Sequence, residues 1–450
     1  MLIDPARLRP PVTHAAEIDA HRVLSFGNAG DGRDCELGKG GDHVAEALRV
    51  DEERDGGEIE PRAGGILARG QRRLGRGHVG ATIRGAGSAW YGRRAKGRFP
   101  AMSDAFLIYG ATGYTGRLLA RAARERGMRP ILGGRNEARL AAIAGALGLE
   151  HRAADLGSLA GSLRDVAVVV NAAGPFVGTF GPVIDACLQG GAHYLDLSGE
   201  VISIEGVARR GPEARARGLM LMPSVGFDVV PSDCLALHVS RRLRRPVRLR
   251  MGVTGLEVSS RGSLRTVASG IGQSVQIRRG GALVDIAPGS LQRSFDFGEG
   301  TQNAFALSWG DVATAWYTTG IGDIEVYYEA IAPLRLMTAV NQNFAWLLGT
   351  PAGRRWLDLH IDMLPEGPTD AQRAFGKGVI VAEAEDASGR VARARVRTPE
   401  AYTFTCATTL AIVERVLGGD VEAGFQTPAR VYGADFVTRF SGVIREDLEG

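Results

Sequence analysis

Cysteine and histidine are scarce in this sequence, and neither is spaced as a metal site requires. The 450 residues include four cysteines, which form no CxxC pair, and eight histidines, which show no HxxxH or HxH spacing. Structural zinc sites and disulfide frameworks depend on such spacings. We therefore expect no metal ion and no disulfide framework, and a reducing cytoplasmic location is the default.

Lysine is also rare, and its positions exclude one common mechanism. The three lysines are Lys39, Lys96 and Lys377, and the residues four positions before them are cysteine, glycine and arginine. The Tyr-x-x-x-Lys pair that short-chain dehydrogenases use for proton transfer is therefore absent. A lysine Schiff base would have to use Lys377, which we expect at the start of a strand.

Long apolar runs and a one-sided charge are absent as well. No run approaches the roughly 18 apolar residues of a membrane-spanning helix. Residues 1–101 hold 17 Lys+Arg and 14 Asp+Glu, and the remaining residues hold 37 and 36. A balance this even offers no electrostatic footprint for a polyanion. We expect no transmembrane segment, no signal peptide and no nucleic-acid partner.

Residues 1–101 differ in composition from the rest of the chain. Residues 51–60 hold six acids, whereas residues 61–100 hold ten basic residues and no acid. Such a segment, without sustained periodicity, cannot bury enough apolar surface to offset its ordering entropy. We expect a disordered or misannotated N-terminal extension, because "MSDAFLIYG" from Met102 begins a normal first strand. A basic arm or a targeting peptide is the alternative, although the many acids and few serines speak against targeting.

A glycine-rich turn follows the first predicted strand. "AFLIYG" (105–110) is an apolar run typical of a buried parallel strand, and "YTGRLLARAARERG" (114–127) has the pattern of an amphipathic helix ending at a glycine. Glycines at such a turn let a diphosphate approach the backbone, and the helix N-terminus offers free N–H groups. This strand–loop–helix unit predicts a dinucleotide cradle formed by Gly110, Thr112, Gly113, Tyr114, Thr115 and Gly116.

The end of the next strand, "PILGG" (130–134), indicates which dinucleotide is bound. NAD enzymes usually place an acid there for the ribose 2′-hydroxyl. Here Arg135 and Asn136 follow, and Glu137 belongs to the next helix. A guanidinium matches a phosphate, so NADP(H) is favoured, with Arg135 and Asn136 in the site. The alternative for Arg135 is an exposed arginine at a helix start. Asp155 is expected near the adenine edge.

The third part of the predicted site follows the buried strand in "VAVVVNAAGPF" (166–176). Ligands of open α/β sheets bind at the carboxyl ends of the strands. We therefore expect the exit of this strand to pass under the nicotinamide ribose. About six strand–helix repeats follow one another up to residue 243, which predicts an α/β fold with a doubly wound parallel sheet of the Rossmann type. The exit consists of Asn171, Ala172, Ala173 and Gly174.

The motifs "YGATGYTG", "GRN", "NAAGPF", "GAHYLDLSGE" and "GFDVVPSD" occur in this order. With them the chain resembles the saccharopine dehydrogenase-like oxidoreductases, and in particular the bacterial branch that includes trans-acting enoyl reductases. The resemblance extends over residues 102–450 and implies a second, sheet-rich α+β domain. We expect an NADP-binding Rossmann domain over 102–243, a substrate or dimerisation domain over 244–400, and a C-terminal segment, 401–450, that returns to the Rossmann domain.

The second half of the chain has its own local signals. "SLRTVASGIGQS" predicts a short helix with Ser263 as a possible cap. The residues around Asp386–Gly389 join two extended runs and predict a hairpin, and Ala401–Gly419 predicts a helix with a glycine stop. Leu336–Leu364 concentrates large apolar side chains. These belong either to core-facing helices or to a surface for a dimer partner, a lipid chain or a membrane.

A bound nicotinamide would supply the hydride chemistry, so the protein has to position a substrate and donate a proton. Crowded carboxylates at the sheet edge can acquire the raised pKa values that proton donation requires, and we predict Asp196 and Asp228 as the catalytic residues. Each could instead stabilise a loop or cap a helix, Asp233 in particular. The other candidates are Tyr194, Ser198, Glu200, Ser232, Tyr317 and Arg261.

The sequence therefore predicts an NADP(H)-dependent oxidoreductase with a small-molecule substrate. A lipid-like or enoyl substrate is favoured over an amino acid, because a two-carboxylate substrate needs several anchoring cations and only Arg261 and Arg265 stand out. A homodimer and peripheral membrane contact are compatible with the apolar second half. The alternative is a non-catalytic NADP-binding protein that is lipid-associated or serves as a scaffold.

Overall fold

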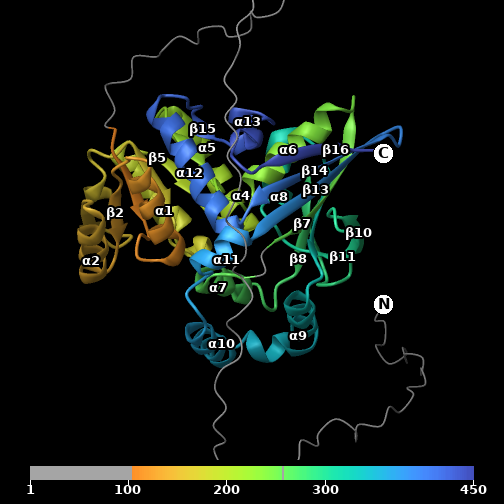
Figure 1. Cartoon of the computed structure of the whole chain (residues 1–450), viewed down its shortest axis with the longest axis horizontal. Helices are drawn as coiled ribbons and strands as arrows, with labels where there is room; N and C mark the ends of the chain where they lie inside the picture. The colour runs from red at the N-terminus through yellow and green to blue at the C-terminus, as the bar shows by residue number, and fades with distance from the viewer. Residues whose placement is uncertain (1–103, 256–257, 450) are drawn as a thin grey trace, which may run out of the picture. The chain divides into compact units, whose positions relative to one another are not determined.

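A computed structural model describes residues 104–255 and 258–449 of the chain. The predicted N-terminal extension, 1–101, lies outside the described residues. Two sheets and the helices around them make up the described part (Figure 1). No helix within it is long and apolar enough to cross a membrane.

The first sheet has seven strands, all parallel, in the order β15-β6-β5-β4-β1-β2-β3. Its central strands are continuous apolar runs with every residue buried, as expected for a parallel sheet that helices cover on both faces. The strands are β1 (Phe106–Tyr109), β2 (Ile131–Gly134), β3 (His151–Ala153), β4 (Val168–Asn171), β5 (His193–Asp196), β6 (Met220–Met222) and β15 (Gly424–Phe425).

This strand order confirms the predicted doubly wound fold. The chain runs outward from β1 to β3, returns to β4 on the other side of β1, and continues to β6. Ligands of such sheets bind where the order reverses, which here is the carboxyl end of β1 and β4. The connecting helices are α1 (Tyr114–Glu125), α2 (Glu137–Leu147), α3 (Phe180–Gly190), α4 (Val201–Arg209), α5 (Gly211–Ala216) and α6 (Val230–Arg241), with the short 3-10 helices η1 (Leu159–Ser162) and η2 (Phe176–Gly178).

The second sheet is mixed and follows the order β10-β11-β12-β7-β13-β14-β16, with β8 and β9 attached to β12. β12 and β7 run parallel, and the other neighbours are antiparallel. The strands are β7 (Pro246–Thr254), β8 (Val275–Arg279), β9 (Ala282–Ile286), β10 (Gln292–Asp296), β11 (Thr301–Ala306), β12 (Asp323–Glu329), β13 (Lys377–Asp386), β14 (Val391–Pro399) and β16 (Ile444–Leu448).

The predicted hairpin is present as β13 and β14, and Lys377 begins the first of these strands. The turn is held by Asp386, whose Oδ1 accepts hydrogen bonds from the backbone N–H groups of Ser388 (2.9 Å) and Arg390 (3.1 Å). An aspartate that bonds to its own turn in this way fixes the point at which the chain reverses.

The remaining helices lie between and beside the strands of the second half, and their capping corrects one prediction. The cap of α7 is Ser260, whose side chain accepts a hydrogen bond from the N–H of Ser263, so the helix begins earlier than expected. These helices are α7 (Arg261–Ser269), α8 (Asp311–Thr319), α9 (Ala332–Leu348), α10 (Pro351–Met363), α11 (Asp370–Phe375), α12 (Ala401–Leu417) and α13 (Pro428–Tyr432), with η3 (Val437–Arg439).

The C-terminal segment joins both sheets. β15 extends the first sheet beside β6, α12 packs against α1, and β16 then pairs with β14 of the second sheet. Helix α6, buried along almost its whole length, packs against β13 and β14. One hydrophobic core therefore includes strands of both sheets, from Phe106 of β1 to Val396 of β14. This shared core holds α7 and α12 close to the glycine-rich turn.

Candidate functional site

The three glycines of the turn between β1 and α1 have different spatial constraints. Gly110 has a φ of 88°, and a Cβ there would lie 2.8 Å from the backbone of Ala172 and Ala173. A Cβ at Gly116 would collide with the carbonyl of Gly110. Gly113 is exposed, and a Cβ there would meet Gly110 O at 3.3 Å. Gly110 and Gly116 are therefore required by the packing of the protein itself, whereas the space beside Gly113 belongs to a pocket.

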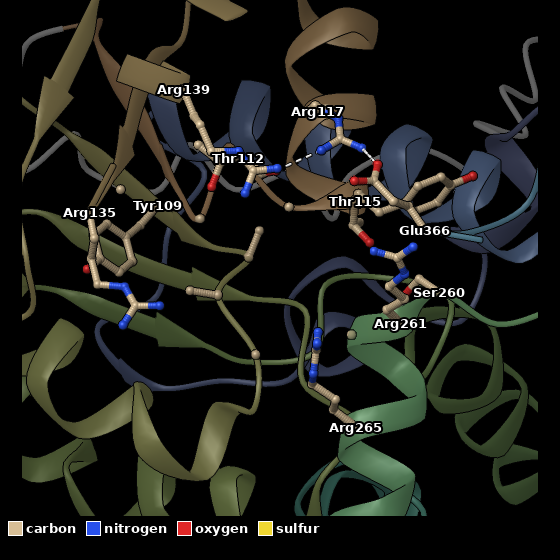
Figure 2. Close-up of a pocket in the computed structure, with 18 of the residues that line it drawn as sticks. Tyr109, Thr112, Thr115, Arg117, Arg135, Arg139, Ser260, Arg261, Arg265 and Glu366 are labelled. Atoms are coloured by element: carbon tan, nitrogen blue, oxygen red, sulfur yellow. Dashed lines mark hydrogen bonds and ion pairs between the residues drawn. The ribbon is translucent and has the colours of Figure 1, made fainter. Parts of the chain in front are cut away.

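That pocket has a volume of ≈ 410 Å³ and lies between the glycine turn and the N-terminus of α7 (Figure 2). The close-up places Thr112 and Thr115 on the turn side and Ser260, Arg261 and Arg265 on the α7 side. The first sheet supplies the glycine turn, the end of β2 and the loop after β4. The residues that line it are Tyr109, Gly110, Thr112, Gly113, Tyr114, Thr115, Arg117, Gly134, Arg135, Arg139, Ala172, Ala173, Gly174, Ser260, Arg261, Gly262, Arg265, Asp362 and Glu366.

Two arginines, one just after β2 and one in the first turn of α2, line the pocket and have no partner among the described residues. Arg135 and Arg139 also line an adjoining cavity of ≈ 400 Å³ together with Thr112 and Asn136. Among the described residues, no ion pair or hydrogen bond engages either guanidinium. The nearby acid, Glu137, forms an ion pair with His151 at 2.7 Å. This end of the pocket therefore presents two uncompensated positive charges, which suits a phosphate.

Three further arginines line the other end, and each is held by the segment around the end of α10. Arg117 is paired with Glu366, and Arg265 is paired with Asp362. Arg261 donates from Nε to the carbonyl oxygen of Leu364 at 2.6 Å. These contacts tie α1 and α7 to α10 and close this side of the pocket. A phosphate here would meet guanidinium groups that already have partners.

The loop after β4 is shaped by a buried asparagine. Asn171 is fully buried and accepts at Oδ1 a hydrogen bond from the N–H of Ala173 (3.1 Å). Its Nδ2 donates to Thr179 Oγ1 (3.1 Å), and Thr179 in turn donates to the carbonyl of Ala173 (2.7 Å). Asn171 therefore fixes the course of the loop, while Ala172, Ala173 and Gly174 line the pocket.

Three of the predicted cofactor residues make structural contacts. Tyr114 lines the pocket, but its hydroxyl donates to Pro368 O and accepts from Arg373 Nη1 at 2.8 Å, which ties α1 to the start of α11. Asn136 caps α2 through the N–H of Arg139. Asp155 accepts hydrogen bonds from the backbone N–H and Oγ of Ser158, which lower its pKa, and it does not line the pocket.

Sequence reasoning missed two kinds of pocket residue: arginines close to the predicted motifs, and acids from a distant segment of the chain. Arg139 lies in the first turn of α2, four residues after Arg135, and a second arginine this close to the end of β2 was a usable signal. Arg117 lies within the first turns of α1 but carried no signal of its own. Asp362 and Glu366 reach the pocket from a segment that is more than two hundred residues away in the sequence, and only the tertiary fold brings them there.

A comparison with known protein families finds a match to the part of the chain that forms β1 to β6. The model of the saccharopine dehydrogenase NADP binding domain matches residues 106–222, which run from β1 to the end of β6. The match shows that this part of the chain is similar to that domain. The glycine turn, the arginines after β2 and the loop after β4 all lie within the matched residues.

Proteins of bacteria and animals are similar to part of this chain. The trans-acting enoyl reductase of Mycobacterium leprae is 31% identical over 157 residues, which cover 32% of this chain and 37% of that protein. The human saccharopine dehydrogenase-like oxidoreductase is 24% identical over 203 residues, which cover 38% of this chain and 47% of that protein. The chain thus spans between about a third and a half of the length of these two curated relatives.

The fold likeness reaches beyond the NADP-binding domain. The apo saccharopine dehydrogenase (L-Glu forming) from Saccharomyces cerevisiae superposes with a TM-score of 0.54 at 12% identity. The superposition covers 77% of this chain and 100% of that chain. The combination of a parallel Rossmann sheet with a second, mixed sheet is therefore a fold that the two proteins share.

Of the two predicted proton donors, Asp196 already uses both of its carboxylate oxygens in hydrogen bonds with its neighbours. It is fully buried, and its Oδ1 accepts from Ser198 N (2.9 Å), Ser198 Oγ (2.7 Å) and Ser224 N (2.8 Å). Its Oδ2 accepts from Tyr194 OH (2.7 Å). Burial raises the pKa of Asp196, and these hydrogen bonds oppose the rise. Because Asp196 joins the loops after β5 and β6 and does not line the pocket, the geometry gives it a structural role.

Asp228 has a different environment. Its carboxylate is half-buried, lies against Gly199, and accepts no hydrogen bond within the described part of the chain. Burial and the charge of Glu200 raise the pKa of Asp228 to about 6. Glu200 itself accepts hydrogen bonds from the N–H groups of Phe176 and Val177, just beyond the pocket-lining loop. Asp228 does not line the pocket, yet it lies on the same edge of the sheet and keeps its proton to a higher pH than an ordinary carboxyl group.

Two further buried carboxyl groups join helices to one another. Asp233 was considered as a cap of α6, but its Oδ2 accepts from Ala429 N of α13 at 2.9 Å. Asp311, in the first turn of α8, accepts at Oδ2 from Ser232 Oγ at 2.8 Å. Burial raises the pKa of Asp233 to about 6 and that of Asp311 well above its usual value. These contacts hold α6, α8 and α13 together.

The free space at Gly113 gives a direct test of the pocket. We expect Gly113→Val to abolish binding of NADPH and NADH, because its side chain would enter the pocket, while the thermal melting temperature changes little. The control is Gly127→Ala, where φ is 78° and nothing lies within 4 Å of an added Cβ. It should cost about 1 kcal/mol of stability and leave affinity unchanged. Wild-type affinity in Gly113→Val, measured by nicotinamide fluorescence, would contradict the cradle.

The raised pKa of Asp228 predicts a dependence of stability on pH. Its pKa is about 6 in the folded protein and 3.8 ordinarily, so between about pH 4 and 6 the unfolded chain loses this proton first. The stability that the protonated Asp228 contributes is therefore fully present below about pH 4 and is lost as pH rises through about 6. At pH 8 the Asp228→Asn variant should therefore have a free energy of unfolding about 1–2 kcal/mol higher than that of wild type, and a higher melting temperature. At pH 4 the two proteins should be equally stable.

The matched control for this measurement is Asp155→Asn. Hydrogen bonds from Ser158 lower the pKa of Asp155, so its contribution is present above the ordinary pKa and lost as pH falls. Asp155→Asn should lower the melting temperature at pH 8, whereas Asp228→Asn should raise it. An Asp228→Asn protein that is no more stable than wild type at pH 8 would show that the buried charge costs nothing.

Proposed function

We propose that this chain is an NADP(H)-dependent oxidoreductase that transfers hydride between the nicotinamide and a lipid-like or enoyl substrate. The observation that carries the proposal is a pair of arginines, Arg135 just after β2 and Arg139 in the first turn of α2, whose guanidinium groups have no partner among the described residues. This is the position at which NAD-specific enzymes carry an acid. The family of the domain, whose description names NADP, supports the same choice.

The residues of the pocket fit such a cofactor in charge and in shape. Its lining includes five arginines and two carboxylates, which favours a polyanion. The diphosphate would lie beside Gly113 at the N-terminus of α1, where backbone N–H groups and the helix dipole favour negative charge. The 2′-phosphate would lie between Arg135 and Arg139, with Ala172, Ala173 and Gly174 beneath the nicotinamide ribose.

In this proposal the bound nicotinamide supplies or accepts the hydride, and the protein supplies position and a proton. Asp228 is the proposed proton donor, because it retains its proton up to about pH 6 and lacks a hydrogen-bond partner within the described residues. Asp196 is not carried forward in this role, because its hydrogen bonds already use both carboxylate oxygens.

The substrate class rests on two observations. The relative from M. leprae, which is similar to this chain over 157 residues, is named a trans-acting enoyl reductase. Helix α10 reaches the pocket through Asp362 and also exposes Trp356 and Met363. An apolar surface next to the pocket suits a substrate with a long apolar part.

One observation favours the second candidate, a non-catalytic NADP-binding protein. Neither Asp196 nor Asp228 lines the pocket, so neither of the two predicted catalytic residues touches the space in which a substrate would lie. A protein of this kind would bind the cofactor without turning it over. The two candidates differ in the fate of the cofactor and not in its affinity.

Cofactor choice is tested at the two arginines. We expect Arg135→Ala and Arg139→Ala each to weaken NADPH binding about 10- to 100-fold, because each removes a charge-assisted bond worth roughly 1.5–3 kcal/mol. Binding of NADH should change little, since it lacks the 2′-phosphate. The control is Arg430→Ala, an exposed arginine of α13 remote from the pocket lining. Equal losses for NADPH and NADH in fluorescence titrations would show that the arginines only support the loop.

Turnover is tested by following NADPH oxidation with medium- and long-chain enoyl thioesters. We expect the rate to fall as pH rises above about 6, because Asp228 then loses its proton. Asp228→Asn should lower the rate about 10²- to 10⁴-fold with unchanged NADPH affinity. Tight NADPH binding without oxidation by any of these substrates would favour the non-catalytic candidate instead.

A further inference from the structure

The exposed apolar side chains of this protein are concentrated on two helices. Among the side chains that the structure describes, 15 large hydrophobic ones are exposed, and seven of these lie between residues 344 and 364. Trp346 is 74% exposed and Met363 is 82% exposed. Patches of this kind on a folded protein mark interaction sites. The seven, which we call the α9–α10 surface, are Phe344, Trp346, Leu347, Trp356, Leu359, Met363 and Leu364.

The two helices are built to present these side chains. They pack against each other, and α10 also packs against α7. At their junction Gly353 allows close approach, since a Cβ there would lie 2.7 Å from Leu348 Cα. Along α10, Trp356, Leu359 and Met363 recur at helical spacing on the exposed face, while Ile361 is buried. Both helices lie at the edge of the molecule beyond α7 and α11 (Figure 1). Of the two alternatives for this segment, core-facing helices do not apply to these seven side chains.

Around this surface the acidic side chains are paired, whereas two basic side chains have no ion-pair partner within the described ranges. The acids of the segment are engaged by arginines of the body of the protein: Arg265 pairs with Asp362 and lies 3.9 Å from Asp358, and Arg117 pairs with Glu366. Arg354 and Arg355 of α10 are exposed, and within the described ranges neither has an ion-pair partner. The uncompensated charge beside the apolar side chains is therefore positive.

We propose that the α9–α10 surface docks onto an anionic phospholipid bilayer. Exposed tryptophan, leucine and methionine side chains beside free arginines are the composition of helices that lie in the membrane interface. Each arginine near an anionic leaflet adds attraction, and neither helix is long and apolar enough to span a membrane. A two-fold pairing with a second copy would bring Arg354 and Arg355 of both copies to one interface, where like charges repel.

Docking would place the bilayer next to the cofactor pocket. Asp362 lines the pocket and Met363 follows it on the docking surface, so the two sites are adjacent in the chain. A lipid-like substrate could then pass from the bilayer to the pocket without crossing water. The docking itself requires neither the cofactor nor turnover, so it stands or falls independently of the proposed function.

The test is co-sedimentation of the full chain with vesicles of phosphatidylcholine alone or mixed with phosphatidylglycerol. We expect binding to the mixed vesicles that weakens with added salt. The double variant Trp346→Ser/Trp356→Ser should lose at least about 10-fold in affinity. Arg354→Gln/Arg355→Gln should lose about 10- to 30-fold at low salt and much less at high salt. Residues 61–100 are basic and are the same in all variants. Differences in vesicle binding between the variants therefore report on the α9–α10 surface and not on this segment.

The matched control is Val247→Ser/Ile444→Ser, which removes two apolar side chains that are 44% and 57% exposed elsewhere on the protein. It should bind vesicles as wild type does. No binding to mixed vesicles, or equal binding by wild type and the tryptophan variant, would overturn the proposal. So would a wild-type dimer that the tryptophan variant converts to a monomer without any vesicle binding. NADPH affinity, measured in parallel, should be unchanged in every variant, which separates this result from the fate of the proposed function.

Discussion

The close approach of two backbone segments at the carboxyl end of β1 and β4 is the constraint on which the site depends. Because Gly110 has no Cβ, the backbone of Ala172 and Ala173 can pass directly over it. The same turn brings Gly116 against the carbonyl of Gly110, which seats α1 on the sheet. With both contacts in place, the N-terminus of α1 and the loop after β4 border one space. Gly113 is left facing that space, and the buried Asn171 keeps the loop in position.

The charges of the pocket divide into two groups with different consequences. Arg117 and Arg265 already have carboxylate partners, so a phosphate that reaches them has to displace Glu366 or Asp362 and gains less. Arg135 and Arg139 have no partner to displace within the described residues. In the proposed function, discrimination between NADPH and NADH would therefore depend on Arg135 and Arg139. The paired arginines serve instead to hold the end of α10 at the pocket.

Local sequence patterns were sufficient where local physics decides the structure. Buried parallel strands are continuous apolar runs, so β1, β2, β4 and β5 could be located, and the hairpin at Asp386 follows from a turn that bonds to itself. The patterns were insufficient where distant segments meet. Asp362 reaches the pocket only through the packing of α10 on α7, and Asp196 is saturated by Ser224 of another loop. Ser263 was chosen as a cap because its hydroxyl has the right chemistry, yet Ser260 precedes the first turn and takes the role.

The same packing explains why the apolar residues of α9 and α10 stay outside. The core has room for α6 between the sheets, and α7 and α12 occupy the positions next to the glycine turn. α10 is held at its end by ion pairs to Arg117 and Arg265, which fix its polar side toward the pocket. With that side turned inward, Trp356, Leu359 and Met363 have to face outward. The electrostatic contacts that close the pocket are therefore also the reason for an exposed apolar face, and the two features of the molecule share one cause.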